Sequence, residues 1–428
     1  MGRWRPLLGG SQGEAALQAV ADIGEALKRR FEEAPPTSDP EDGVPDGSFA
    51  GGEAGRAVLF SYLAQAGVVD GAEETAVAMV DAAADAMAQE AMLPSLHAGY
   101  TGVGWAVTHL EGRVLDAGDE DAAAPVDEEL LELLGTEDWQ DDYDLISGLV
   151  GFGVYALERL PRPRARECLE RVVDLLARTA ERDGAAGTVT WHTRPELLPP
   201  WQRALCPDGY YNAGLAHGVP GAIGVLAGTL AAGVRVELAR ELLHGSVAWL
   251  LGLPPPEGTA FSSWYTSGTD QGASRAAWCY GDPGVAAALD LAGLAASEPR
   301  WRERALAVAL DVARRSREAC RVADVGICHG ATGLAHVLNR LYQATGHEEL
   351  GEAARSWFDT ALGMRAEGAG IAGFTAMLPN ASGGVTEQTD PSFLTGASGV
   401  ALALLAAATD LEPEWDRVLL VSLRDTSL

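Results

Sequence analysis

The chain has few basic residues for its size. Its 428 residues include 31 Lys plus Arg against 61 Asp plus Glu, which gives a formal charge of −30. Proteins that bind nucleic acid or anionic membranes carry clustered positive charge, because they must neutralise phosphate groups. We therefore exclude nucleic acid and anionic membrane surfaces as main partners.

Long aliphatic runs are also missing. The best candidate for a membrane span, residues 218–234, contains five glycines and a proline, and residues 1–17 hold only one Leu-Leu pair. A bilayer requires a longer aliphatic segment, and so does the apolar part of a signal peptide. The sequence predicts neither membrane insertion nor export, and we expect a buried helix within 218–234.

Cysteines are scarce and show no framework spacing. There are five of them, an odd number, which argues against a disulfide scaffold and favours a reducing cytoplasm. Cys168 and Cys320 lie beside apolar helical stripes and are expected to be core thiols, whereas Cys206 has no assigned role. The composition, 47% hydrophobic and 21% charged, is typical of an ordered globular chain.

One short motif recurs seven times. It is Gly-x-x-Gly followed by a run of small and apolar residues, and it begins at Gly52, Gly99, Gly148, Gly218, Gly281, Gly330 and Gly396. The second glycines are 47, 49, 70, 63, 49 and 66 residues apart, and about fifty residues hold two helices and two loops. A repeat of this length decides the architecture before any single motif does.

Amphipathic segments lie between the motifs. Apolar residues recur at helical spacing at Leu17, Val20, Ile23, Leu27 and Phe31, at Leu169, Val172, Val173 and Leu176, and at Leu306, Ala309, Leu310 and Ala313. Helices that are apolar all round must be buried, whereas these keep a charged face. We therefore predict an all-α fold, an α/α toroid with seven inner helices that follow the glycine motifs and seven outer helices. Thr188–His192 is one short strand candidate.

The predicted toroid is a single domain over residues 1–428. We expect a closed ring, because neither terminal repeat looks like the polar cap that an open array needs. Three segments are expected to depart from the repeat: 34–47, which is rich in proline and acid, 117–144, which is acidic, and 188–207, which carries prolines and tryptophans.

The glycine loops predict where function lies. If the inner helices run in the same direction, all seven loops meet at one end of the toroid. Glycine allows a positive φ and close packing of loops, and free N–H groups are expected at the helix starts. One Gly-x-x-Gly alone could be a helix stop, but seven equivalent ones favour a shared role.

Three of these loops carry soft metal-ligand residues in the two positions before the first glycine: Cys279, Cys328 with His329, and His217. Two thiolates and an imidazole are a typical ligand set for a catalytic zinc with an open fourth position. The cysteines are 49 residues apart, so the ligands converge only if the loops converge. The alternative is two buried cysteines and a surface histidine.

Four other residues are candidates for the same site. His217 occupies the equivalent place in another loop and is a general acid or base, a fourth ligand, or part of a capping network. Asp144 orients a histidine, carries a proton or caps a helix. Arg275 holds a carboxylate or an enolate, or forms an ordinary ion pair. Tyr280 donates a hydrogen bond or simply packs.

Four segments together resemble the lanthionine synthetase C-like (LanC) cyclases. They are YNAGLAHGVPG (211–221), SRAAWCYGDPG (274–284), GICHGATG (326–333) and FLTGASGVALALL (393–405). The resemblance extends through all seven glycine loops, and the WCYG and CHG pair is its most specific part. The family fold, an α/α toroid of seven inner and seven outer helices, agrees with the fold predicted above.

The resemblance implies one zinc per chain, held by Cys279, Cys328 and His329. It implies that the substrate is a dehydrated precursor peptide with a leader and a core, in which a cysteine thiolate adds to dehydroalanine or dehydrobutyrine and forms lanthionine or methyllanthionine. Zinc lowers the pKa of a bound thiol, and ring closure places the thiolate and the alkene at high effective concentration.

The same resemblance implies roles for the remaining candidates. His217 matches the family's histidine that protonates the enolate, and Asp144, Arg275 and Tyr280 match polar residues of that site. No long dehydratase or kinase region precedes the first motif, so we expect a stand-alone cyclase in the cytoplasm and a separate dehydratase partner.

Three other functions compete with this one. A LanC-like enzyme could add glutathione or another free thiol to dehydrated residues, and a zinc-containing scaffold could bind peptides without catalysis. An α/α-toroid glycosidase would leave the cysteines unexplained. Protein prenyltransferases also place zinc in a helical toroid, but with another ligand pattern.

Overall fold

The computed structural model describes residues 4–33, 46–89, 91–116, 118, 121–266, 272–379 and 384–424. The chain divides into two compact units, the first formed by 1–123 with 316–415 and the second by 124–315 with 416–428. None of the helices in the described ranges combines the length and hydropathy that a membrane span needs. A single domain over 1–428 stays a prediction.

The first unit is built from helices and one two-stranded sheet. Its elements are α1 (Gly10–Glu33), α2 (Glu53–Ala66), α3 (Ala72–Gln89), α4 (Tyr100–Leu110), α13 (Arg317–Cys320), α14 (Ala331–Thr345), α15 (Glu348–Gly363), β5 (Ala376–Pro379), β6 (Val385–Gln388) and α16 (Ala397–Ala408). Strands β5 and β6 are antiparallel, with Ala376 opposite Gln388. A 3-10 turn, η2 (Glu414–Leu419), follows α16.

The second unit is also mainly helical and contains two two-stranded sheets. Its elements are α5 (Ala124–Leu133), α6 (Leu149–Arg159), α7 (Pro163–Thr179), β1 (Glu181–Asp183), β2 (Thr188–Thr190), η1 (Pro195–Leu197), α8 (Pro200–Leu205), β3 (Tyr211–Asn212), α9 (Val219–Ala231), α10 (Val236–Leu251), β4 (Trp264–Tyr265), α11 (Asp282–Ala295) and α12 (Pro299–Arg314). The strands form two antiparallel pairs, β1 with β2 and β3 with β4. The predicted strand near Thr188 is confirmed as β2.

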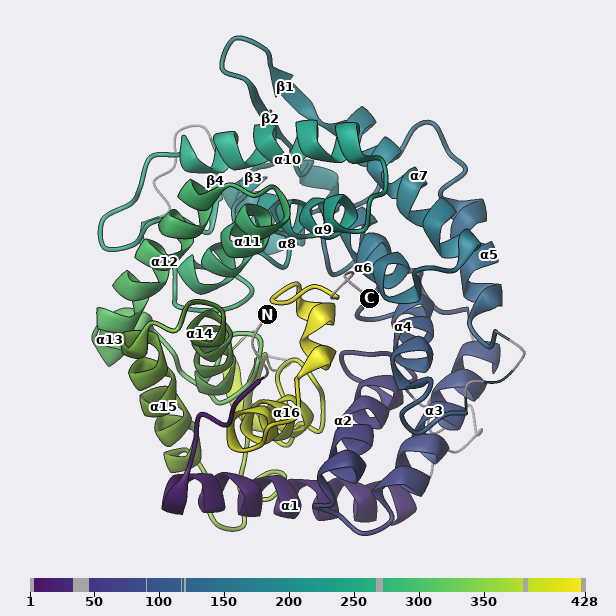
Figure 1. The fold of residues 1–428 in the computed structure, drawn as a ribbon, viewed down its shortest axis with the longest axis vertical. Helices are drawn as coiled ribbons and strands as arrows, with labels where there is room; N and C mark the ends of the chain where they lie inside the picture. The colour runs from purple at the N-terminus through teal and green to yellow at the C-terminus, as the bar shows by residue number, and fades with distance from the viewer. Residues whose placement is uncertain are drawn as a thin grey trace. The chain divides into compact units, whose positions relative to one another are not determined.

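Each unit has an inner row of helices covered by outer ones. In the first unit, α14, α16, α2 and α4 pack side by side in that order, and α15, α1 and α3 cover them (Figure 1). In the second unit, α9 packs between α6 and α11, and α7, α10 and α12 lie outside (Figure 1). The inner helices are those that follow the glycine motifs, so the predicted pairing of inner and outer helices is confirmed within each unit.

Burial follows the sequence pattern of each layer. Eleven of the 12 residues of α16 are buried, whereas in α7 the buried side chains form one stripe that includes Leu169, Val172, Val173 and Leu176. The predicted face of α12 is rotated, because Ala305, Val308, Ala309 and Val312 are buried and Leu306 and Leu310 are only half-buried. Small residues face the neighbouring helix, and the leucines lie at the margin.

One predicted feature needs correction. Cys320 is buried, but it lies in the separate short helix α13, which Ser316 caps, and not on the face of α12. The acidic segment 117–144 contains the outer helix α5. Its Asp127 is buried in an ion pair with Arg159.

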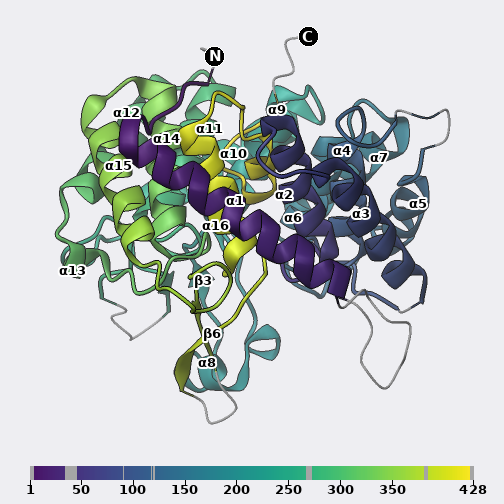
Figure 2. The same cartoon turned by 90° about the horizontal axis from the view of Figure 1, so that it is seen from below.

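The other two predicted excursions are segments 34–47 and 188–207. Residues 34–45 of the predicted excursion 34–47 lie outside the described residues. Segment 188–207 includes β2, η1 and α8, and its departure from the repeat stays a prediction. Figure 2 shows α8 well away from α9. Cys206, which follows α8, packs there with Leu198, Tyr210 and Trp264.

The glycines of the repeat are required by close backbone approach. A Cβ at Gly52 would lie 1.8 Å from the carbonyl oxygen of Asp46, and one at Gly333 would lie 1.8 Å from that of Ile327. Of the seven first glycines, only Gly281 has a positive φ, of 130°. The expectation of positive φ is therefore wrong for the other six first glycines, which have extended backbones. Glycine is needed there because loop backbone atoms lie where a Cβ would be.

That folding back also uses the N–H groups expected to be free at the helix starts. In α14 the amides of Ala331 and Thr332 donate to the carbonyls of Asp324 and Val325, at 2.9 and 3.1 Å. In α6 the amide of Val150 donates to Tyr143 in the same way, at 2.9 Å. These helices need no side-chain cap, because the loop carbonyls satisfy the first amides.

Adjacent loops within each unit are joined by backbone hydrogen bonds. In the first unit, Cys328 N donates to Leu394 O, Phe393 N to Ala50 O, and Ala50 N to His97 O, each at 2.8 Å. In the second unit, Leu145 N donates to Ala216 O at 3.1 Å and Ala216 N to Cys279 O at 3.2 Å. We call these bonds the loop ladder. The ladder brings the residues just before the first glycines together.

Candidate functional site

The reactive side chains occupy the two positions just before a first glycine. Counting from that glycine, Cys279 and Cys328 are at position −2, and His217, Tyr280 and His329 are at position −1. Position −2 takes part in the loop ladder, so the backbone of both cysteines is held by neighbouring loops. A repeat that fixes this backbone places whatever side chain the sequence puts there.

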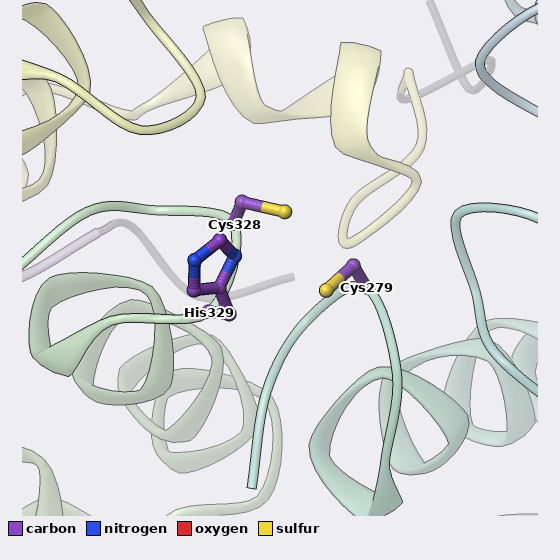
Figure 3. Close-up of side chains that lie close together, drawn as sticks. All are labelled: Cys279, Cys328 and His329. Carbon is purple, nitrogen blue, oxygen red and sulfur yellow. The ribbon is translucent and has the colours of Figure 1, made fainter. Parts of the chain in front are cut away.

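Cys279, Cys328 and His329 form a group that could hold a metal ion. One ligand atom from each lies within 4.8 Å of the others (Figure 3). Cys279 is 6% exposed, and the other two residues are half-buried. The structure thus places together the three residues predicted as ligands.

The residues of this group fit zinc. Two sulfurs and one imidazole nitrogen are the donor atoms that Zn²⁺ prefers, and three protein ligands leave a position for a substrate atom. A buried carboxylate, Asp324, stands beside His329 with 3.4 Å between its Oδ2 and the ring Nε2. Neither Asp324 oxygen has a hydrogen-bond partner among the described residues. An uncompensated buried carboxylate favours positive charge nearby.

His217 and Asp144 form the second part of the site. The Nδ1 of His217 is hydrogen-bonded to Oδ2 of Asp144, and Oδ1 of Asp144 accepts the Ser147 amide at 2.7 Å. Asp144 is buried, whereas the His217 side chain is 37% exposed. Asp144 therefore both holds its own loop and orients the histidine, and the Nε2 of His217 is left for another partner.

The charges around His217 raise its pKa. Burial acts to lower the pKa of His217, but the Asp144 carboxylate outweighs it through its charge and its hydrogen bond. Burial and the neighbouring Asp144 charge raise the pKa of Asp142 to about 6, against a smaller opposing effect of His217. The result is a histidine that carries a proton in a larger fraction of molecules at neutral pH.

Tyr280 covers one side of His217. The two rings are stacked, with centroids 5.8 Å apart and planes at 24°. The Nδ2 of Asn212 donates to the Tyr280 hydroxyl at 3.2 Å and to the Tyr210 hydroxyl at 3.1 Å. Burial raises the pKa of Tyr280 well above its usual value, and the Tyr210 hydroxyl adds to this effect. Tyr280 is therefore a neutral phenol beside the histidine.

Arg275 is not brought to this cluster. Its side chain is exposed, and among the described residues it has no hydrogen bond or ion pair. Its backbone carbonyl lies where a Cβ at Gly281 would be, at 1.9 Å. The structure thus explains why glycine follows at 281, and it supports neither an ion pair of Arg275 nor a contact with His217.

Three residues near the candidates were missed from the sequence: Asn212, Tyr210 and Asp324. Asn212 and Asp324 share one place in the repeat, six residues before the first glycine, which Asp46, Asp142 and Asp390 also occupy. Aligning the seven loops at this place would have shown a polar position that recurs with the glycines. Tyr210 had no such signal.

Comparison with known proteins agrees with the geometry. Residues 44–420 match the family model described as "Lanthionine synthetase C-like protein". Among solved structures, the chain is similar to "Nisin cyclase", with a TM-score of 0.73 and 17% sequence identity, over 93% of this chain and 96% of that chain. At this identity the likeness shows the fold alone, and it confirms the predicted fold class.

Proposed function

Because the chain belongs to the lanthionine synthetase C-like family, we propose that it is a zinc-dependent lanthipeptide cyclase. It adds the thiolate of a peptide cysteine to a dehydroalanine or dehydrobutyrine of the same peptide, which closes a lanthionine or methyllanthionine ring. The observation that carries the proposal is the group of Cys279, Cys328 and His329.

The three ligands would hold one zinc ion per chain. When bound, zinc would lower the pKa of the peptide thiol and so supply a thiolate at neutral pH. The chain's own part is to keep its ligands in place. The amide of Cys328 is bonded to Leu394 O, and the carbonyl of Cys279 accepts from Ala216 N. Binding the thiol and the alkene in one site raises their effective concentration.

His217 is the proposed proton donor. The new S–C bond forms at the β-carbon of the alkene, whose π electrons move toward the carbonyl and give an enolate. The α-carbon then takes up one proton, which balances the proton that the thiol loses. Asp144 supports this role in two ways, because it raises the pKa of His217 and binds Nδ1, which directs Nε2 to the substrate.

Tyr280 is the proposed hydrogen-bond donor to the enolate oxygen. Its phenol is neutral, and because Asn212 donates to the phenol oxygen, the phenol hydrogen is available to another acceptor. We retain Arg275 as a candidate for attracting the enolate or a substrate carboxylate. Its exposed position favours contact with a bound peptide over contact with the His217 cluster.

The proposed substrate is a dehydrated precursor peptide with a leader and a core. A separate dehydratase would prepare it. Among the described residues no disulfide joins Cys168, Cys206, Cys279, Cys320 or Cys328. We propose that the protein acts in a reducing cytoplasm.

Mass spectrometry of a dehydrated peptide tests the reaction. The full chain is incubated with the peptide, with zinc and after removal of zinc by a chelator. An unchanged mass with loss of free thiols, seen only with zinc, supports cyclisation. A mass gain equal to an added thiol such as glutathione would instead support addition between molecules. Binding of the peptide without either product would favour the non-catalytic scaffold.

A further inference from the structure

One position of the repeat closes a turn in several loops. Six residues before the first glycine, Oδ1 of Asp46 accepts the amide of Ser48 at 2.9 Å, and Oδ1 of Asp390 accepts that of Ser392 at 2.8 Å. Asn212 does the same with Gly214, at 2.8 Å. In each case the side chain satisfies the amide two residues later, an Asx turn.

Asp324 occupies this position but does not close the turn. Neither of its oxygens has a hydrogen-bond partner among the described residues, although its side chain is only 3% exposed. A buried carboxylate without hydrogen bonds costs stability. In other loops the side chain at this position is hydrogen-bonded. A carboxylate at residue 324 that lacks such a bond therefore points to a role other than closing the turn.

The direction of the Asp324 side chain follows from the Asp390 loop. There, Oδ2 of Asp390 accepts the hydroxyl of Thr395, the residue at position −1. The residue at position −1 after Asp324 is His329, whose Nε2 lies 3.4 Å from Oδ2 of Asp324. This separation is slightly longer than a hydrogen bond, and a small rotation of the ring would close it. Both carboxylates therefore face the residue just before the glycine.

Gly330 leaves the space that this arrangement needs. A Cβ at residue 330 would lie 2.3 Å from Gly326 N, 2.4 Å from the carbonyl carbon of Val325 and 2.5 Å from Oδ1 of Asp324. A larger residue would therefore displace the backbone of this turn together with the carboxylate. Figure 3 shows the two ring nitrogens of His329 on opposite sides, one of them facing the sulfur of Cys328. The nitrogen near Asp324 and the nitrogen near Cys328 can thus have different partners.

We propose that Asp324 is a positioning residue for the metal ligand His329. It accepts the Nε2–H of the ring, which fixes the tautomer and leaves the unprotonated Nδ1 to bind zinc. A carboxylate that accepts this hydrogen also makes the ligating nitrogen more basic. Asp324 itself is not a ligand. The inference rests on the zinc site of the proposed function and adds a residue that the motif Cys328-His329 does not contain.

Zinc affinity is the first test. Zn²⁺ binding to the full chain is measured by competition with a chromophoric chelator for the wild type, Asp324→Asn and the matched control Asp390→Asn. Loss of such a partner typically weakens metal binding 10–100-fold, so we expect about that loss for Asp324→Asn and less than about twofold change for Asp390→Asn. The amide oxygen at 390 still closes the turn.

The outcomes separate this inference from the proposed function. Unchanged zinc affinity in folded Asp324→Asn overturns the positioning role and leaves the proposed function intact. A wild type that binds no zinc overturns both. Equal loss in both variants would mean a general effect on the loops, and it also overturns the inference.

Two spectroscopic measurements cover the remaining cases. If Asp324 were a ligand, the d–d bands of the Co²⁺-substituted Asp324→Asn protein would shift relative to the wild type, and we expect them to keep their position. If Asp324→Asn does not fold, ¹⁵N NMR of histidine-labelled, zinc-loaded wild type gives the tautomer directly. We expect His329 to be protonated at Nε2, and protonation at Nδ1 would overturn the proposal.

Discussion

The loop before α14 and the loop before α16 lie in the same unit and share several backbone contacts. We call them the Gly330 loop (residues 324–333) and the Gly396 loop (residues 390–399). The first helical amide donates to the carbonyl seven residues earlier in both, Ala331 to Asp324 and Ala397 to Asp390, each at 2.9 Å. The second glycine of each also lies against a backbone carbonyl.

Their side chains differ at the two positions before the glycine. The Gly330 loop has Cys328 and His329 there, and the Gly396 loop has Leu394 and Thr395. The carboxylate of the Gly396 loop is satisfied by its own turn and by Thr395, whereas that of Asp324 is not. The comparison teaches that the repeat supplies a fixed backbone and that chemistry depends on a few substituted side chains.

The largest expected effect comes from removing a thiolate at position −2. Cys328→Ala should lose zinc, as measured by elemental analysis, and slow ring formation by at least about 1000-fold, because thiol activation is lost. Leu394→Ala, the same position in the Gly396 loop, should keep about one zinc per chain. Zinc retained by folded Cys328→Ala would contradict the assigned ligand set.

The next effect concerns position −1 in the second unit. His217→Ala should lower the rate of ring formation by about 100- to 10,000-fold, as loss of a general acid does, and should leave zinc content unchanged. Ser147→Ala, at the same position before Gly148, is the control, since its side chain is exposed. Unchanged ring formation in His217→Ala would disprove the proton-donor role.

The same histidine predicts a pH dependence. Since His217 acts as its protonated form, the rate should fall as pH rises through its pKa. The Asp144 charge raises that pKa, so the wild type should keep its activity to higher pH than Asp144→Asn. A falling limb at the same pH in both proteins would show that another group sets it.

A smaller effect is expected at the position six residues before the glycine. Asn212→Asp keeps the acceptor for the Gly214 amide but removes the donor to Tyr280 and Tyr210. Losing hydrogen bonds of this kind costs about 1 kcal/mol each, and loss of the one to Tyr280 corresponds to about fivefold in rate if Tyr280 acts as proposed. The readout is kcat together with the titration of tyrosinate absorbance.

The smallest effect should appear in the Gly396 loop. Thr395→Val removes the hydroxyl that Asp390 accepts and should lower the free energy of unfolding by about 1 kcal/mol, measured by urea denaturation. Zinc content and ring formation should not change. A loss of zinc would mean that the two loops are not independent in the way the comparison suggests.

Much of the fold could be predicted because its main determinants are local. Glycine is required wherever a Cβ would collide with a loop carbonyl, as at Gly52 and Gly333, and seven such places are visible in the sequence. The ligands could be predicted for the same reason, since Cys279 and Cys328 stand at one offset from these glycines. The repeat position thus carried the prediction of the metal group.

What was missed depends on contacts between distant segments. Asn212 reaches Tyr280 across 68 residues, and the buried Asp127 is paired with Arg159 on another helix. A sequence pattern does not show such partners. The place of Arg275 beside the WCYG motif likewise does not show where its side chain points, and in the structure that side chain is exposed.

The loop ladder also has a consequence for protein engineering. Its hydrogen bonds use only main-chain atoms. The Leu394 side chain can therefore be replaced while the carbonyl of residue 394 still accepts from Cys328 N. Leu394 and Thr395 are half-buried, which leaves room for other side chains. A library of substitutions at these two positions could therefore introduce a new metal ligand, nucleophile or peptide-binding side chain without changing the main-chain bonds of the Gly396 loop.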